Sequence, residues 1–162
     1  RAPRRADGAL ALSPAPRSRS YMFAAVRDAI LKIDPATGTV VATISLDGYY
    51  SNYMQADRRS LWVPTDSALL QIDMASAQIT GTYPLPQRAN RVPLLAEGEA
   101  SVWVCNCTAQ PVDVLWQFDV DSLEWVTETS VGNLDWQGWI AYLGNAVWGY
   151  TLQDEIVRLK VP

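Results

Sequence analysis

The stretch Leu31-Lys32-Ile33-Asp34-Pro35-Ala36-Thr37-Gly38-Thr39-Val40-Val41 decides the fold, because its pattern returns twice along the chain. In each copy a short apolar run ends at an Asp, and a Thr or Ser follows three residues later. The later copies are Leu70-Gln71-Ile72-Asp73 with Ser76 and Trp116-Gln117-Phe118-Asp119 with Ser122. The three Asp lie 39 and 46 residues apart, a period that is typical of repeat architectures.

An aromatic anchor repeats ahead of each of these runs. The anchors are Tyr21-Met22-Phe23, Ser60-Leu61-Trp62-Val63 and Ser101-Val102-Trp103-Val104, and a fourth copy, Ala146-Val147-Trp148-Gly149, follows near the end of the chain. Eight positions before each Trp of the last three anchors stands an apolar residue: Met54, Leu95 or Ile140. Each repeat unit therefore contains at least four short segments.

These segments have the composition of strands. They are only four to six residues long, rich in Val, Ile, Thr, Trp and Tyr, and separated by turn-forming residues. Four antiparallel strands repeated about every 40 to 45 residues are typical of a β-propeller blade. We therefore predict an all-β β-propeller of three to four blades. For the two central blades the expected strands are residues 53–56, 61–64, 69–73, 79–83, 93–96, 102–105, 115–119 and 125–131.

Two sets of repeated residues receive structural roles. Asp34, Asp73 and Asp119 each open a turn, where a carboxylate accepts hydrogen bonds from amides two or three residues on. Trp62, Trp103 and Trp148 stand at equivalent blade positions and are expected to be buried between adjacent blades. We assign neither set to catalysis or metal binding.

The repeats also resemble a known group of proteins. The phrases Ile33-Asp34-Pro35-Ala36-Thr37-Gly38-Thr39-Val40-Val41-Ala42-Thr43-Ile44 and Ala100-Ser101-Val102-Trp103-Val104 are similar to bacterial YVTN-type repeats and to streptogramin-lyase-like (virginiamycin B lyase-like) propellers. The resemblance covers roughly residues 21–162 and implies the propeller fold. The lyase chemistry of that group is similar to histidine-assisted base catalysis, and this chain contains no His. The resemblance therefore implies the fold without that activity.

The first 20 residues differ from the rest of the chain. They hold five Arg, three Pro, three Ser and five Ala, and they have little strand-forming character. We interpret residues 1–20 as a disordered tail, with a ring-closing strand at residues 8–13 as the alternative, and residues 21–162 as the propeller repeats. The strand count leaves two readings: about half of a larger propeller, or a small ring whose ends share a blade.

The net charge of the chain limits the kinds of partner that it can bind. The chain has 13 basic and 17 acidic residues, and without residues 1–20 the remainder has 8 basic and 16 acidic residues, a net charge of −8. Because phosphate contacts need clustered Lys and Arg, we expect no nucleic-acid binding. No run of 18 apolar residues is present, so we expect no membrane span.

The two cysteines, Cys105 and Cys107, are two residues apart at the end of one predicted strand. We interpret them as two free or loosely paired structural thiols. A metal or redox role is the less favoured reading, because a metal site would need further ligands and the chain has no His.

Candidate binding residues lie in the connections between successive blades. In a propeller these connections emerge on one face around the central channel, where ligands usually bind. Aromatic rings beside amides and charges suit a sugar-like, peptide or amphipathic ligand. The alternative is that these aromatics only pack their own loops. The candidates are Tyr49, Tyr53, Arg88, Asn90, Arg91, Asp135, Trp136 and Gln137.

The sequence thus favours a non-catalytic binding or sensor module that recognises a small molecule, glycan or peptide on its loop face, without a cofactor or metal. Asp66, Ser67 and Asp113 lie in strand connections without a His partner, so no nucleophile and base pair stands out. The alternative is a divalent-cation-dependent enzyme of the lyase or lactonase type. We further expect an extracytoplasmic, bacterial protein that associates with further propeller blades.

Overall fold

The computed structural model describes residues 20–26, 28–46, 53–89, 93–98, 100–107, 113–132, 136–151 and 154–161 of the 162-residue chain, with the backbone alone at 136–138. Within these ranges the chain forms fourteen β-strands and no helix. The strands make four antiparallel sheets. The predicted all-β class is therefore confirmed.

Each sheet is a meander in which strands that follow one another along the chain are neighbours. The first sheet holds β1 (Met22–Val26), β2 (Ala29–Asp34) and β3 (Thr39–Ser45), and the second holds β4 (Gln55–Ala56), β5 (Ser60–Pro64), β6 (Ala68–Asp73) and β7 (Gln78–Pro84). The third sheet holds β8 (Leu94–Glu97), β9 (Ser101–Asn106), β10 (Asp113–Asp119) and β11 (Glu124–Gly132), and the fourth holds β12 (Trp136–Tyr142), β13 (Ala146–Thr151) and β14 (Ile156–Lys160). The strands predicted for the two central blades differ from those observed by no more than two residues at either end.

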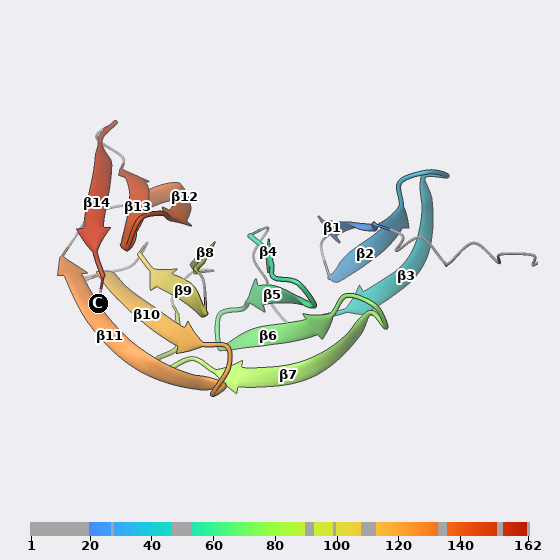
Figure 1. Ribbon diagram of the computed structural model, residues 1–162, viewed down its shortest axis with the longest axis horizontal. Helices are drawn as coiled ribbons and strands as arrows, with labels where there is room; N and C mark the ends of the chain where they lie inside the picture. The colour runs from blue at the N-terminus through green and yellow to red at the C-terminus, as the bar shows by residue number, and fades with distance from the viewer. Residues whose placement is uncertain are drawn as a thin grey trace, which may run out of the picture.

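The four sheets follow one another along an arc (Figure 1). The strands β3, β7 and β11 run along the convex rim, whereas β4, β8 and β12 lie on the concave side. The first and fourth sheets stand at opposite ends of the arc, which does not close. This is the radial arrangement of propeller blades in a partial ring.

Strand register makes the sheets comparable position by position. Phe23 in β1 pairs with Lys32, and Trp62 in β5 pairs with Gln71. In the same way Trp103 in β9 pairs with Gln117, and Trp148 in β13 pairs with Arg158. Among the described residues, the first sheet therefore lacks an equivalent of the inner strand, and the fourth sheet lacks an equivalent of the outer strand.

Three apolar clusters lie between successive sheets. Ile30 and Leu61 belong to the cluster between the first and second sheets. Trp62 belongs to the next cluster, and Trp103 to the cluster between the third and fourth sheets. The predicted burial is confirmed for Trp62 and Trp103, which are 0% and 1% exposed. It is wrong for Trp148, which is half-buried, because no described sheet covers its side of the fourth sheet.

The repeated Asp residues make the predicted turns. Asp34 Oδ1 accepts a hydrogen bond from the amide of Ala36 at 2.9 Å. Asp73 Oδ1 accepts from the amide of Ser76 at 2.6 Å, and Asp119 Oδ1 accepts from the amide of Ser122 at 2.7 Å. These bonds lower the pKa of the Asp73 and Asp119 carboxyl groups, each chiefly through the backbone amide of its Ser. The structural role of the three Asp is confirmed.

Cys105 and Cys107 are joined by a disulfide, whereas the sequence left open whether these structural cysteines are free or loosely paired. Their Cα atoms are 5.1 Å apart, within the range that a disulfide spans. Both residues are 0% exposed and belong to the cluster between the third and fourth sheets. This Cα separation is shorter than that of two residues in a fully extended strand, so the chain bends where β9 ends at Asn106.

Candidate functional site

The sheets have two ends that differ in their connections. Because antiparallel turns alternate, the connections between successive sheets lie at the same end as the β5–β6 and β9–β10 turns. We call this end the loop face. The β4–β5, β6–β7, β8–β9 and β10–β11 turns lie at the opposite end, which we call the turn face.

An ion pair holds one sheet-to-sheet connection on the loop face. Arg88 follows β7, and its Nη2 and Nε donate to Asp66 Oδ2 at 2.7 and 3.2 Å. The amide of Ala89 donates to the carbonyl of Asp66 at 2.8 Å. The hydrogen bond from Arg88 is the main reason why the pKa of Asp66 lies below its ordinary value. The connection after β7 is therefore fixed beside the β5–β6 turn.

Three buried polar residues occupy one equivalent position at the loop-face end of successive sheets. They are Thr65, Asn106 and Thr151, which are 7%, 8% and 2% exposed. Thr65 Oγ1 donates to the carbonyl of Ala68 at 2.9 Å and accepts from the amide of Ala68 at 2.8 Å. Thr151 Oγ1 accepts from the amide of Glu155 at 3.3 Å. Both threonines thus satisfy their hydroxyl groups within their own turns.

Asn106 differs from these two threonines. Its Oδ1 is buried, and it has no hydrogen-bond partner among the described residues. An unpaired buried acceptor costs about 1 to 3 kcal/mol, so Asn106 Oδ1 calls for a donor that is not among the described residues. Asp113, which begins β10 in the same sheet, is also buried at 2% exposed. The third sheet therefore places two buried acceptor side chains at its loop-face end.

The structure describes the positions of only some of the predicted binding residues. Arg88 lies on the loop face as expected, 78% exposed and paired with Asp66. Tyr53 is half-buried and packs against the two clusters on either side of the third sheet, so its ring supports the core as well as bordering the face. Trp136 and Gln137 begin β12 rather than lying in a loop, and their side chains are outside the described part. Tyr49, Asn90, Arg91 and Asp135 lie outside the described residues.

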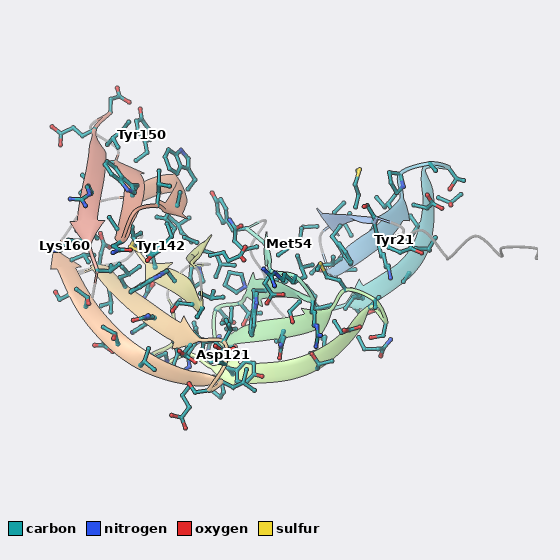
Figure 2. The ribbon with its side chains drawn as sticks, in the orientation of Figure 1. Tyr21, Met54, Asp121, Tyr142, Tyr150 and Lys160 are labelled. Atoms are coloured by element: carbon teal, nitrogen blue, oxygen red, sulfur yellow. A yellow bond between two sulfur atoms is a disulfide. The ribbon has the colours of Figure 1, made fainter. Side chains whose placement is uncertain are left out.

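Sequence reasoning missed a cavity of about 670 Å³ on the turn face. It lies between the first and second sheets, where Lys32 Nζ sits 4.2 Å from the ring centroid of Tyr21 and donates to the carbonyl of Ala75 at 2.6 Å. Figure 2 shows Tyr21 beside the first sheet, at the right-hand end of the arc. The residues lining the cavity are Ser20, Tyr21, Phe23, Arg58, Arg59, Asp73, Met74 and Ala75. The adjacent Arg58 and Arg59 are the sequence feature that could have indicated this cavity. Nothing in the sequence, however, places them beside Tyr21.

The described part of the chain lacks two simple patterns, a group of metal ligands and a long apolar helix. No three His, Cys, Asp or Glu side chains there are grouped so that they could hold a metal ion. The described residues also contain no helix of the length and hydropathy needed to cross a bilayer.

Solved structures with similar folds are β-propeller proteins. Apo AztD from Citrobacter koseri is 20% identical with a TM-score of 0.58, over 71% of this chain and 33% of that one. The Pan2 WD40 domain from Neurospora crassa is 13% identical with a TM-score of 0.62, over 90% and 47%. BamB from Moraxella catarrhalis is 13% identical with a TM-score of 0.60, over 91% and 49%.

These likenesses bear on the fold alone, because every identity is low. The chain spans between a third and a half of the length of the three propellers. No protein-family model matches the chain, and no curated protein matches it. The fold is therefore that of a β-propeller, in the form of a partial ring.

Proposed function

We propose that this chain is a non-catalytic β-propeller module that binds a small molecule, glycan or peptide on its loop face. The observation that carries the proposal is the buried Oδ1 of Asn106, which has no hydrogen-bond partner within the described part of the chain. Equivalent positions in the two flanking sheets use Thr65 and Thr151 to satisfy their own turns. Among the described residues, Asn106 is the one of these three residues whose side-chain acceptor has no partner, and we assign that acceptor to the ligand.

The side chains near Asn106 on the loop face define the class of ligand. Asn106 Oδ1 offers an acceptor, so the ligand must present an N–H or O–H group. Sugar hydroxyls and peptide amides are such donors. Arg88 on the neighbouring connection is paired with Asp66, and its exposed guanidinium adds further N–H donors for a ligand. The candidates Tyr53 and Trp136 are assigned the apolar contact surface. Tyr49, Asn90, Arg91, Asp135 and Gln137 complete the proposed contact set.

Two further properties belong to the proposal. The Cys105–Cys107 disulfide favours an extracytoplasmic location, since disulfides persist in oxidising compartments and are rare in the cytosol. The resemblance of the repeats to YVTN-type propellers agrees with a bacterial, secreted or periplasmic protein. Neither property changes the chemistry proposed for the loop face.

The variant Asn106→Thr tests the assignment, because it installs the residue found at both equivalent positions. A panel of oligosaccharides and short peptides is screened with the unmodified protein by tryptophan fluorescence. For any binder found, Asn106→Thr should weaken affinity by about three- to tenfold, the effect of losing one buried hydrogen bond. The control Asp121→Ala changes an exposed side chain in the β10–β11 turn on the other face and should leave affinity unchanged.

Two results would count against this function. Equal affinity in Asn106→Thr and the unmodified protein would remove the loop-face assignment. Turnover of a lactone or streptogramin substrate that is abolished by EDTA and restored by a divalent cation would favour the enzymatic alternative. Ligand binding that persists in EDTA supports a binding module.

A further inference from the structure

The two ends of the arc expose positions that are buried everywhere else in the fold. Met22 in β1 is equivalent to Leu61, Val102 and Val147, because each directly precedes its aromatic anchor. Met22 is 55% exposed, whereas the other three are 4%, 0% and 0% exposed. We call the side of the first sheet that carries Met22 the N-end face.

The fourth sheet, at the other end of the arc, also exposes a position that is buried in the other sheets. Ile156 in β14 lies two residues before Arg158, the partner of the Trp148 anchor, and is therefore equivalent to Ile30, Leu69 and Leu115. Ile156 is 68% exposed, whereas the other three are all 0% exposed. Trp139, on the same side of the fourth sheet, is 47% exposed. We call this side the C-end face.

Inside the arc these two kinds of position meet at every interface. Ile30 and Leu61 share the cluster between the first and second sheets. Leu69 and Val102 share the next cluster, and Leu115 and Val147 share the one after it. The first residue of each pair stands at the position equivalent to Ile156 in its own sheet. The second residue stands at the position equivalent to Met22. The C-end face and the N-end face are thus the two halves of an interface that the chain already forms three times.

The two faces of one chain are too far apart to meet, since Tyr21 and Tyr150 lie at opposite ends of the arc (Figure 2). Interfaces between unlike faces produce a closed ring when the rotation closes and a filament when it does not. The matched part of this chain covers 47% of the Pan2 chain and 49% of the BamB chain. Two copies of the four-sheet arc therefore supply about the length of one such propeller.

We propose that two copies of this chain associate head to tail, the C-end face of each packing on the N-end face of the other, to close one ring. Each chain contributes four sheets, so the ring has eight, the upper end of the typical range of four to eight blades. The new contacts bury Met22, Trp148 and Ile156 in the way their equivalents are buried within the arc. The proposal does not depend on the ligand assigned to the loop face.

Molar mass in solution tests this directly. The 162-residue chain has a mass of 17.9 kDa, and size-exclusion chromatography with light scattering should give about twice that mass at micromolar concentration. Ile156→Glu and Met22→Glu should each reduce the mass to that of one chain with an unchanged far-UV spectrum. Val126→Glu is the matched control, since Val126 is 50% exposed but lies in the rim strand β11, and it should remain dimeric.

A cross-linking experiment identifies the contact. Met22→Cys and Ile156→Cys proteins are prepared separately and oxidised alone or as an equimolar mixture. Only the mixture should give a covalent dimer, because the proposed interface joins residue 22 of one copy to residue 156 of the other. A mass of one chain for the unmodified protein would overturn the proposal. A concentration-dependent series of larger species, or covalent dimers of either variant alone, would overturn the closed head-to-tail ring.

Discussion

Trp62 donates its indole Nε1–H to Asp57 Oδ2 at 2.8 Å and so ties the blade anchor to the β4–β5 turn. The equivalent of Asp57 in the third sheet is Gly98, since the amides of both donate to the carbonyl of a Ser at the start of the next strand. Trp103 Nε1 is correspondingly buried without a hydrogen-bond partner among the described residues. A Cβ at Gly98 would lie 3.2 Å from Tyr142 Cδ1, so the stacked Tyr142 ring occupies the space that a side chain would need.

Asp57→Ala should lower the free energy of unfolding by about 2 to 3 kcal/mol, because it removes three hydrogen bonds and leaves a buried indole N–H unpaired. The bonds to Asp57 come from the amides of Arg59 and Ser60, each at 2.6 Å, and from Trp62. Urea unfolding monitored by circular dichroism measures the change. Asp121→Ala serves as the exposed control, with an effect within about 0.5 kcal/mol. Equal losses in both variants would show that Asp57 has no special role.

Trp103→Ala and Trp148→Ala make a matched pair at equivalent positions. Trp103 is 1% exposed, so its truncation should cost about 3 to 5 kcal/mol. Trp148 is half-buried and donates to the carbonyl of Leu143 at 3.1 Å, so within a single chain it should cost less than half as much. Both values come from urea unfolding of monomeric protein in the Ile156→Glu background. A larger loss at Trp148 would contradict the blade alignment.

Gly38 has a φ of +69°, and a Cβ placed there would meet nothing within 4 Å. Gly38→Ala should therefore destabilise the protein by about 1 kcal/mol through backbone conformation alone. Gly38→Asn should cost less, because Asn tolerates the left-handed region better than Ala. The melting temperatures of the two variants, measured by thermal unfolding, show which of them is more stable. An Ala variant as stable as the unmodified protein would mean that the turn adopts another conformation.

Glu97→Gln should raise thermal stability at pH 7. Burial and the nearby Asp57 carboxylate raise the pKa of Glu97 above its ordinary value of 4.5. The folded state therefore binds this proton more tightly than the unfolded state, so stability is greatest below pH 4.5 and declines as pH rises through the folded pKa. The gain should be no more than about 2 °C, since solvent screens a half-exposed group.

The pH dependence separates this mechanism from a packing effect. The advantage of Glu97→Gln over the unmodified protein should disappear below pH 4, where Glu97 is neutral in both states. Glu124→Gln, at an exposed position in β11, is the control. A gain that persists at pH 3.5 would point to packing rather than charge.

Sequence repetition was sufficient to predict the fold, because each blade repeats the same turn and the same anchor. The Asp73 turn shows this, since its carboxylate bonds to Ser76 as the spacing predicted. Positive φ at Ala77 and Leu123, +57° and +60°, could not be predicted, because those residues usually avoid this region. Their positions match Gly38, so the turn geometry imposes the conformation despite the side chain.

The candidate site was predictable only in outline. Arg88 lies on the expected face, since the position of a connection follows from strand alternation. The ion pair between Arg88 and Asp66, and the lack of a described partner for Asn106 Oδ1, depend on which side chains meet in the fold. The residues next to them in the sequence indicate neither feature. The cavity between Tyr21 and Arg59 likewise joins residues from different blades.

Amide chemical shifts test the loop-face assignment most directly. A ¹⁵N-labelled sample is titrated with a glycan or peptide that the fluorescence screen identifies, and shift changes are mapped onto the structure. We expect the largest changes at Thr65, Asn106, Asp113 and Thr151, and the Asn106→Thr variant should lose them. Changes confined to the turn-face cavity around Tyr21 and Arg59, with the loop face silent, would contradict the account.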